Sequence, residues 1–363
     1  MKKWNIGWGA VSACNMNCEF CYSSEKRKSS TDITYQDWKR FVDENAMSIA
    51  TINYGTGENA ISADWFKLIR YIRANYPHIR QALTTNGFVS EAVKKNPEHM
   101  SAFLEAIDEV DVSLDFADAK RHGEFRGQPR AYEWAVSAME LCHNNKIPLT
   151  IVIMGSRVNL YEENLRGIFE VAKRFDAIVR INMYRPTNGI NGCSSRYILS
   201  IEDLLKCLRF LNDNYSVLSL NDPLLSSLLT DETVSDPSGI DSLRILPNGD
   251  VTPSTYLITD EYVIANLREN VSLECIEERI LQKGIIKRVT PNDCGNCVHK
   301  DTCCGGVLDR RYLWYGNLNR KDPYCFADNS ELKNKYNFKI KLSEEKFQSV
   351  HNGYLPTMFF KNR

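Results

Sequence analysis

The sequence predicts an α/β protein in which residues 1–215 form a parallel sheet covered by helices. Six short apolar runs of strand type alternate with six segments whose apolar residues recur at three- and four-residue spacing. Because successive strand-helix units need crossover connections, the sheet is either an open doubly wound sheet or a partial (βα)6 barrel of TIM type. The alternation breaks near residue 215, which predicts a second, smaller domain after it.

The expected elements follow one another along the chain without a gap long enough for another fold. Several of the helices begin directly after a Thr, Ser or Asp residue that can cap a helix. The strands are expected at Asn5–Val11, Ala50–Gly55, Ile79–Thr84, Val110–Asp115, Pro148–Met154 and Ala177–Tyr184. The helices are expected at Tyr35–Asn45, Ala63–Asn75, Pro97–Ile107, Tyr132–Asn144, Tyr161–Phe175 and Ile201–Asn214.

The part of the chain after residue 215 has a different pattern. Two apolar runs, Leu243–Leu246 and Val251–Leu257, flank the string Pro247-Asn248-Gly249-Asp250. Asn-Gly supplies the positive φ angles of a tight turn, so these runs predict a β-hairpin. We expect a core domain at residues 1–215, a linker at 216–237, a small cysteine-rich domain at 238–330 and a C-terminal tail at 331–363.

Charge and hydropathy argue against two classes of partner. Lys and Arg number 45 against 46 Asp and Glu, so the chain lacks the basic excess that binds a nucleic-acid backbone. The longest apolar stretches, such as Ile151–Met154, are far too short to cross a membrane. The stretch after Met1-Lys2-Lys3 is too short and too polar for an export signal. Closely spaced cysteines indicate metal sites in a reducing compartment, and we expect a cytoplasmic location.

Three cysteines lie together just after the first expected strand, in the string Cys14-Asn-Met-Asn-Cys18-Glu-Phe-Cys21. Groups of thiolates bind iron-sulfur clusters or zinc. Three of them can hold three corners of a four-iron cluster and leave the fourth iron open to a ligand, whereas structural zinc takes four protein ligands. The triad therefore favours a cluster with an open coordination position.

This CxxxCxxC string, with Phe20 before its last cysteine, resembles the signature of the radical S-adenosylmethionine (radical SAM) enzymes. The resemblance implies a [4Fe-4S] cluster on Cys14, Cys18 and Cys21, whose open iron binds the amino and carboxylate groups of SAM, with Phe20 near the adenine. It further implies that an electron from the cluster cleaves SAM to a 5′-deoxyadenosyl radical, which abstracts a hydrogen atom from the substrate.

Further matches to this family follow the second and third expected strands. Gly55-Thr56-Gly57-Glu58 resembles the family's GGEP motif, in which Gly55 and Gly57 would let the backbone approach SAM and Glu58 would accept its ammonium group. Thr56 and Asn59 depart from the usual Gly and Pro, which puts the shape of this loop in doubt. Thr84-Thr85-Asn86-Gly87 contains the TNG string that is common in the superfamily.

The resemblance also assigns SAM contacts near the fourth and fifth expected strands. Ser113 and Asp115 close the fourth strand, Arg126 is placed to meet the SAM carboxylate, and Asn159 follows the fifth strand. Ordinary capping or loop hydrogen bonding is the alternative for Ser113, Asp115 and Asn159. The catalytic acid or base is unknown, and the residues considered for it are Asp115, Asp118, His122 and Tyr184.

A second cysteine group, Cys294, Cys297, Cys303 and Cys325, supplies four thiolates. By composition alone, zinc or a four-iron cluster fits equally. Residues 238–325 resemble the SPASM extension of peptide-modifying radical SAM enzymes, which holds two auxiliary clusters. The usual cysteines of one cluster are replaced here near Ser238, at Ser254 and at Val307. The resemblance therefore implies a single auxiliary [4Fe-4S] cluster, as in the shorter twitch version. Cys304 stands at a usual Gly position and is expected to be a bystander, with a competing ligand as the alternative.

The resemblance implies an oxidoreductase that modifies a ribosomally synthesised peptide, by oxidative cross-linking or a related reaction. The expected partners are a precursor peptide, a separate leader-binding protein and an electron donor such as flavodoxin or ferredoxin. Alternatives are a small-molecule radical dehydrogenase of sugar or aminocyclitol type and a peptide epimerase or splicing enzyme. A non-enzymatic, zinc-binding structural protein is a further alternative.

Overall fold

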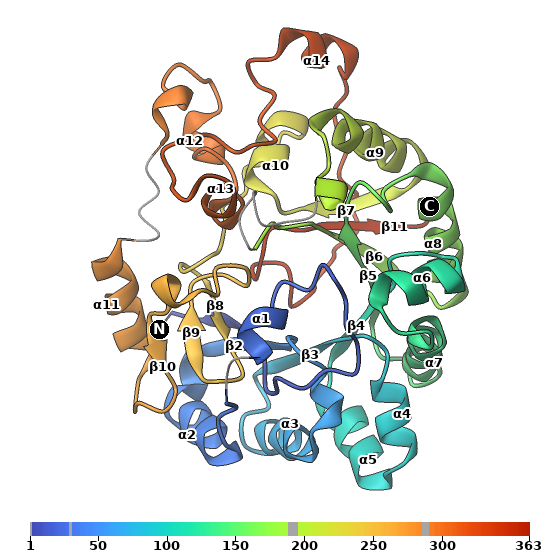
Figure 1. The fold of residues 1–363 in the computed structure, drawn as a ribbon, viewed down its shortest axis with the longest axis vertical. Helices are drawn as coiled ribbons and strands as arrows, with labels where there is room; N and C mark the ends of the chain where they lie inside the picture. Colours follow the sequence, from blue (N-terminus) through green and yellow to red (C-terminus); the bar gives the residue numbers. More distant parts are fainter. Residues whose placement is uncertain (1, 29–30, 188–194, 285–289) are drawn as a thin grey trace.

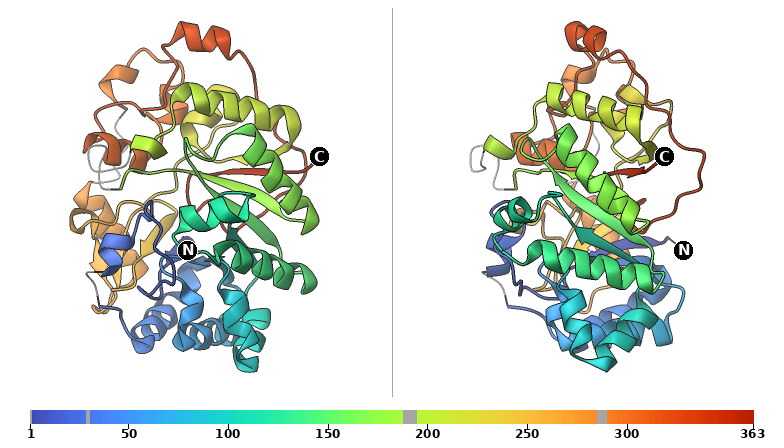
Figure 2. Two further views of the ribbon diagram at one scale, coloured as in Figure 1. Left: turned by 45° about the vertical axis from the view of Figure 1, so that its right-hand side comes forward. Right: turned by 90° about the vertical axis from the view of Figure 1, so that its right-hand side faces the viewer.

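The computed structural model describes residues 2–28, 31–187, 195–284 and 290–363. Within this part of the chain, eleven strands form one open sheet in the order β10-β9-β8-β1-β2-β3-β4-β5-β6-β11-β7. The sheet curves, and helices cover its outer side (Figures 1 and 2). The predicted α/β fold with a parallel partial barrel is thus confirmed.

Six parallel strands make up the central part of the sheet, and each lies within a few residues of its predicted position. Helices α2, α3 and α9 have the predicted bounds, while the short helices α1, α4 and α6 were not predicted. The strands are β1 (Trp4–Trp8), β2 (Ile49–Tyr54), β3 (Arg80–Thr85), β4 (Glu109–Ser113), β5 (Leu149–Gly155) and β6 (Ile178–Met183). The helices are α1 (Ser24–Lys28), α2 (Tyr35–Asn45), α3 (Ala63–Asn75), α4 (Val89–Lys94), α5 (Pro97–Ala106), α6 (Ala119–Arg126), α7 (Ala131–Asn144), α8 (Glu162–Arg174) and α9 (Ile201–Asn214).

Helix α2 illustrates how local sequence fixes these elements. The Thr34 hydroxyl accepts a hydrogen bond from the Asp37 amide while the Asp37 carboxylate accepts one from the Thr34 amide, which forms a capping box. Trp38, Phe41 and Val42 then fall on one face of the helix and are buried in the main core. Burial of such side chains contributes about 1.5–3 kcal/mol each, far more than helix propensity.

The predicted hairpin is present and extends the same sheet. β8 (Ser242–Ile245) runs parallel to β1 on one side and pairs antiparallel with β9 (Asp250–Thr252) on the other, followed by β10 (Ala265–Asn266). Gly249 has a φ of +89° in the turn, as the Asn-Gly pair predicted. The remaining helices are α11 (Leu273–Lys283), α12 (Lys300–Cys303), α13 (Leu308–Tyr315) and α14 (Ser330–Lys335).

The expected linker and tail both contain elements of the fold. β7 (Ser216–Leu220) and α10 (Pro223–Leu229) lie in the linker, and β11 (Met358–Lys361) lies in the tail. β11 pairs antiparallel with both β6 and β7, and Met358, Phe359 and Phe360 are buried there. The domain boundaries remain a sequence prediction, but the sheet continues across them.

A buried ion-pair network joins the cysteine-rich region to α10. Arg310 on α13 is completely buried, and its guanidinium pairs with Asp222 at 2.7 Å and with Asp322 at 2.6 Å. Asp222 also caps α10 by accepting from the amides of Leu224 and Leu225. Because both carboxylates have further partners, this network fixes α10, α13 and the loop before Cys325 relative to one another.

Among the residues described, no helix is both long and apolar enough to span a lipid bilayer.

Candidate functional site

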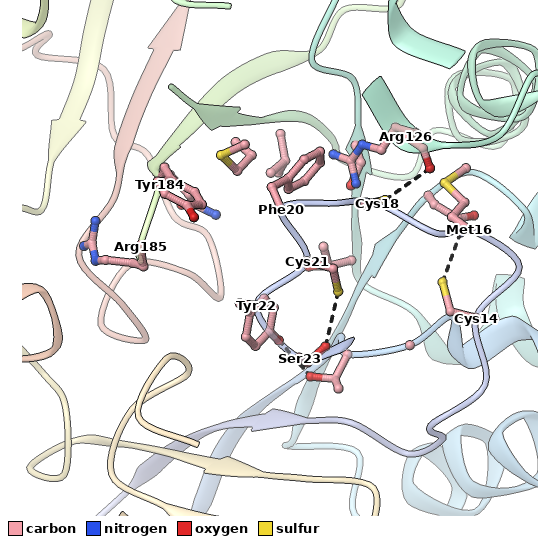
Figure 3. Close-up of a pocket in the computed structure, with 18 of the residues that line it drawn as sticks. Cys14, Met16, Cys18, Phe20, Cys21, Tyr22, Ser23, Arg126, Tyr184 and Arg185 are labelled. Carbon is pink, nitrogen blue, oxygen red and sulfur yellow. Dashed lines mark hydrogen bonds between the residues drawn. The ribbon is translucent and has the colours of Figure 1, made fainter. Parts of the chain in front are cut away.

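A cavity lies at the carboxyl ends of the parallel strands. Its lining comes from the loop after β1, from Thr56 and Gly57 after β2, from the end of β3, from Ser113 on β4 and from residues 182–185 at the end of β6. Figure 3 shows the loop after β1 running across this cavity, with Phe20 between Arg126 and Tyr184. Active sites of barrel-type enzymes assemble at this end of the strands, so the cavity is the candidate site.

The loop after β1 places Cys14, Cys18 and Cys21 together in the lining. Asn86 Nδ2 lies 3.9 Å from Cys14 Sγ, and the Cys18 thiol donates to the Arg126 carbonyl at 3.4 Å. Arg27 Nη2 donates to Cys21 Sγ at 3.7 Å. Each thiol is thus oriented by a polar group from another part of the site.

Burial controls the protonation of these thiols. It raises the pKa of Cys14, and it raises the pKa of Cys18 to about 11. Burial also acts to raise the pKa of Cys21, but Arg27 and Ser23 outweigh it and leave that pKa below its usual value. A metal or cluster that binds the thiolate form would therefore displace protons from Cys14 and Cys18.

The donor set of the cavity fits an iron-sulfur cluster. Three thiols line it, and no carboxylate is among the described residues in its lining. Soft thiolate donors without hard oxygen ligands suit iron-sulfur clusters. Within the described parts of the chain, no three His, Cys, Asp or Glu side chains are grouped for a single metal ion.

Phe20 forms one side of the cavity. Its ring stacks on Phe125 with centroids 4.3 Å apart, and the guanidinium of Arg126 lies 5.2 Å from its centroid. Tyr197 contacts both rings edge-on at 6.0 Å. This aromatic wall beside the thiols is suited to contact a planar ring such as adenine.

The loop after β2 turns sharply at Thr56 and Gly57, which have φ angles of +80° and +68°. A Cβ on Gly57 would overlap the carbonyl oxygen of Val11 and lie 2.7 Å from that of Ala13. Glycine is therefore required here both for its conformation and for the close approach to the loop that carries Cys14. Gly55 precedes this turn and lies outside the cavity lining.

Glu58 is completely buried behind the cavity wall and is not part of the lining. Its carboxylate accepts hydrogen bonds from Thr85 Oγ1 at 3.0 Å and from the Asn86 amide at 2.9 Å. Burial raises its pKa to about 7, against the opposing effect of these hydrogen bonds. Glu58 therefore holds the β3 loop against the β2 loop.

The raised pKa of Glu58 predicts a pH dependence of stability. The folded protein holds this proton more tightly than the unfolded chain does. The contribution of Glu58 to the free energy of unfolding is therefore fully present below the usual carboxyl pKa of 4.5 and is lost as the pH rises to about 7. The shift corresponds to roughly 3 kcal/mol. We expect Glu58→Gln to flatten this dependence, as measured by urea unfolding of the protein without SAM at pH 5–8. Glu170→Gln, at an exposed position, is the control, and an equal slope in wild type and Glu58→Gln would contradict the prediction.

The residues predicted near the fourth and fifth strands divide into two groups. Ser113 and Arg126 line the cavity, whereas Asp115 and Asn159 are completely buried outside its lining. Asp115 pairs with Arg126 at 2.6 Å and accepts from the Met154 amide at 2.8 Å, so it positions Arg126 from behind. The Asn159 side chain accepts from the Ser156 amide and donates to the Met154 carbonyl, both at 2.9 Å.

Of the residues considered as acid or base, Tyr184 is the one that lines the cavity. Asp118 caps α6 by accepting from the Arg121 amide at 2.8 Å. His122 is completely buried, and its Nδ1 accepts from the Asp115 amide at 3.2 Å. Burial, together with the nearby Arg126, lowers the pKa of His122 well below its usual value. His122 is therefore neutral in the folded protein.

The second cysteine group also converges. Cys294 and Cys303 are buried, and burial together with neighbouring thiols of the group raises the pKa of each to about 11. Cys325 lies close enough to contribute to both shifts, and Cys297 does so as well. Four thiols are the donor set of an iron-sulfur cluster or of zinc, but in the described structure these four are not drawn together around a single metal ion.

Cys304 differs from these four thiols in conformation. It ends α12 with a φ of +49°, and its thiol is directed to the Asp301 carbonyl at 3.9 Å. A left-handed residue after a helix is usually Gly, so Cys304 stands at a position that favours Gly.

Sequence reasoning missed several residues of the cavity lining, among them Arg185, Tyr256 and Met16. Arg185 and Tyr256 lie in its lining, with the Arg185 guanidinium 5.4 Å from the centre of the Tyr256 ring. Arg185 pairs with the buried Asp309 at 2.8 Å, and Asp309 in turn accepts from Ser254 Oγ at 2.8 Å. Arg185 directly follows the last predicted strand, so its place at a strand end could have indicated it. Met16 and Tyr256 lie in loops and give no comparable signal.

Comparisons with known proteins give one family model and several similar proteins. Residues 10–166 match the Radical SAM superfamily. Mycofactocin maturase MftC of Mycolicibacterium smegmatis is 25% identical over 340 residues, which cover 88% of this chain and 82% of the relative. The AdoMet-dependent heme synthase of Methanosarcina barkeri is 30% identical over 176 residues, 48% of each chain.

A solved structure shares the fold over nearly the whole length. The structure of native anSMEcpe with bound AdoMet and Cp18Cys peptide superposes with a TM-score of 0.67 at 16% identity, covering 92% of this chain and 98% of that one. The matched region of the family spans the three thiols and every strand-end loop of the cavity up to Asn159. Residues 10–166 therefore form a Radical SAM domain, and the chain is an enzyme similar to radical SAM peptide maturases.

Proposed function

We propose that the chain cleaves SAM reductively at a [4Fe-4S] cluster held by Cys14, Cys18 and Cys21 and modifies a ribosomally synthesised peptide. The observation that carries this proposal is the meeting of the three thiols with Phe20, Gly57, Ser113 and Arg126 around one cavity. When bound, the cluster and SAM supply a 5′-deoxyadenosyl radical that abstracts a hydrogen atom from the substrate.

One part of the cavity lining is suited to SAM and another part to the substrate. Phe20, stacked on Phe125, provides a ring surface for adenine, and Gly57 brings backbone close to the thiols. Arg126 faces the cavity with one side of its guanidinium held by Asp115, and it is suited to the SAM carboxylate. Gly55, Glu58, Asp115 and Asn159 support this arrangement from behind the lining.

The remaining wall is suited to the substrate. Tyr184, Arg185 and Tyr256 line the cavity and belong to neither the thiol loop nor the aromatic pair. Figure 3 shows Tyr184 and Arg185 on the side of the cavity away from Cys14. We infer that a peptide side chain enters against this wall and that Tyr184 is the acid or base nearest to it.

The peptide substrate is supported by the relatives. The long match is to a protein named as a maturase, and the superposed structure holds a peptide beside AdoMet. A precursor peptide, a leader-binding protein and a flavodoxin or ferredoxin are the proposed partners. The match to the heme synthase covers 48% of the chain. Because of this match, a small-molecule substrate is the alternative that the substrate test must distinguish from a peptide.

We further propose one auxiliary [4Fe-4S] cluster on Cys294, Cys297, Cys303 and Cys325. Cys297, Cys303 and Cys325 each act to raise the pKa of Cys294, which supports the grouping of these four thiols. Cys304 also acts to raise the pKa of Cys303, but its thiol is directed to the Asp301 carbonyl. Such a cluster has no open coordination position, so it would accept an electron from the substrate and favour an oxidation.

The test uses anaerobically reconstituted protein and a variant with Cys14, Cys18 and Cys21 replaced by Ala. We expect about eight irons per parent chain, about four per variant chain, and 5′-deoxyadenosine release from the parent alone. A matched variant with Ala at the buried Cys142 and Cys207, which line no part of the cavity, is expected to keep all its iron and activity. No deoxyadenosine from the iron-loaded parent would overturn the proposal, and four irons with bound zinc would overturn the auxiliary cluster.

The substrate class is tested separately by mass spectrometry. A peptide encoded by a short reading frame beside the gene is incubated with the active enzyme, SAM and reductant. A loss of hydrogen mass from the peptide supports oxidative modification. An unchanged peptide, together with conversion of a sugar or aminocyclitol whose biosynthesis genes neighbour this one, would favour the dehydrogenase alternative.

A further inference from the structure

The segment after Ser330, for which the sequence suggested no role, brings one side chain close to the site. Tyr354 is buried with 3% of its surface exposed, and its hydroxyl accepts a hydrogen bond from Arg244 Nη1 at 3.1 Å. The same hydroxyl lies 2.5 Å from Thr255 Oγ1. A Cβ on Gly7 would overlap this hydroxyl, so Tyr354 occupies space that β1 leaves open by carrying glycine there.

Arg244 connects Tyr354 to the loop after β2. It lies on β8, has 1% of its surface exposed, and donates from Nη2 to the carbonyl oxygen of Gly55 and to Thr56 Oγ1. Tyr22, directly after Cys21, shares a hydrogen bond of 2.7 Å with the same Thr56 hydroxyl. Thr56 is therefore held from two sides, by the cysteine loop and by Arg244.

Thr56 needs such support because of its backbone. Its φ of +80° lies in the left-handed region, which β-branched residues avoid because Cβ and the backbone clash there. The GGEP motif that this loop resembles has Gly at this position, and Gly adopts such a φ at no cost. Without its hydrogen-bond partners, Thr56 would relax to a negative φ and move Gly57 out of the cavity wall.

We propose that Tyr354 and Arg244 act together as a strut that holds Thr56 in its left-handed conformation and so keeps Gly57 in place for SAM. This inference rests on the proposed binding of SAM in the cavity. Arg244 and Tyr354 lie outside the cavity lining, so they are positioning residues. Gly at position 56 would adopt this φ without support. Thr56 instead depends on two side chains from the C-terminal third of the chain.

The test is a double-mutant cycle read out as SAM affinity, measured by equilibrium dialysis on anaerobically reconstituted protein. We expect Arg244→Met to weaken SAM binding about tenfold and Tyr354→Phe to weaken it by a smaller factor, because the second change removes one hydrogen bond to Arg244. In a Thr56→Gly background, Arg244→Met is expected to change the affinity less than about threefold, since Gly needs no support at this φ. Tyr336→Phe is the control, since it also removes a tyrosine hydroxyl of the C-terminal segment, one that donates to Glu202, and it is expected to leave SAM affinity unchanged.

A second readout separates this inference from the proposed function. Hydrogen exchange of the amides of residues 55–58 reports the loop directly, without SAM. Faster exchange in Arg244→Met and in Tyr354→Phe than in wild type supports the strut even if wild type fails to bind SAM, which would overturn the proposed function alone. Wild-type exchange in both variants, or an equal loss of SAM affinity with and without the Thr56→Gly change, would overturn the strut. Tyr354→Phe removes only a hydroxyl, so the strut stays testable if Arg244→Met does not fold.

Discussion

Arg310→Met is expected to lower the free energy of unfolding by about 3–5 kcal/mol, because it leaves two buried carboxylates without their cation. Arg310 lies between Asp222 and Asp322, both of which are nearly inaccessible to solvent. Burial acts to raise the pKa of Asp222, but Arg310 outweighs it and holds that pKa below its usual value. Met fills a similar volume without a charge. The decrease in the free energy of unfolding therefore reports the loss of the ion pairs and not the creation of a cavity.

The measurement is chemical denaturation, followed by fluorescence, at neutral pH. Arg279→Met is the matched control, because the partly exposed Arg279 pairs with Glu269 at 3.0 Å on the surface, and such pairs contribute less than about 1 kcal/mol. Asp322 also accepts a hydrogen bond from the Val307 amide at 3.0 Å and lies three residues before Cys325. If the proposed auxiliary cluster is present, we therefore expect Arg310→Met to lose its iron as well. An unchanged denaturation midpoint would show that the carboxylates find other partners.

Gly57→Ala is expected to reduce 5′-deoxyadenosine release about 100-fold, because the added methyl group pushes the loop that carries the first thiols away from the β2 loop. The methyl group would overlap the Val11 carbonyl and lie 2.7 Å from the Ala13 carbonyl, and both of these are backbone atoms that cannot rotate aside. A displacement of this loop moves Cys14 relative to Cys18 and Cys21. Iron content and the rate of SAM cleavage are measured together on the reconstituted variant.

Gly284→Ala separates the effect of crowding from the effect of backbone conformation. Gly284 has a φ of +65°, close to the +68° of Gly57, but a Cβ there meets no atom within 4 Å. The Gly284→Ala variant is expected to lose some stability but to keep both its iron and its activity. If Gly57→Ala and Gly284→Ala behave alike, then close contact between the two loops is not what makes Gly57 necessary.

The central strands could be predicted because their signal is local. β1 to β6 are buried apolar runs in a regular alternation with helices, and parallel strands covered on both sides leave this pattern in any sequence. The predicted end of β1, at Val11, is three residues too late, because Ala10 donates to the Asn59 side chain at 3.0 Å instead of to a strand. Helix α6 gave no signal, since few of its residues are apolar.

The tail strand could not be predicted for a different reason. β11 has only four residues, and its place is fixed by pairing with β6 and β7, which lie far away in the sequence. Short strands of this kind depend on contacts that no local pattern contains.

The sequence predicted those parts of the candidate site that depend on the type of residue and on its place after a strand. The three thiols and Gly57 follow strand ends, and the carboxyl ends of parallel strands meet at one edge. Glu58 and Asp115 follow strand ends too, but the structure turns them toward neighbouring loops, which only side-chain packing decides. Arg244 and Tyr354 depend on contacts between residues far apart in the sequence, so their role needed the fold.

The position of β11 has a consequence for biosynthesis. β7 is bonded to the rest of the sheet through β11, so these two strands can join β6 only after residues 221–357 have been translated. Until then, the parallel sheet ends at β6, while the β1 to β6 region and its three thiols have already emerged from the ribosome. The nascent chain therefore exposes an unpaired edge at β6, which β11 covers only when translation is nearly complete.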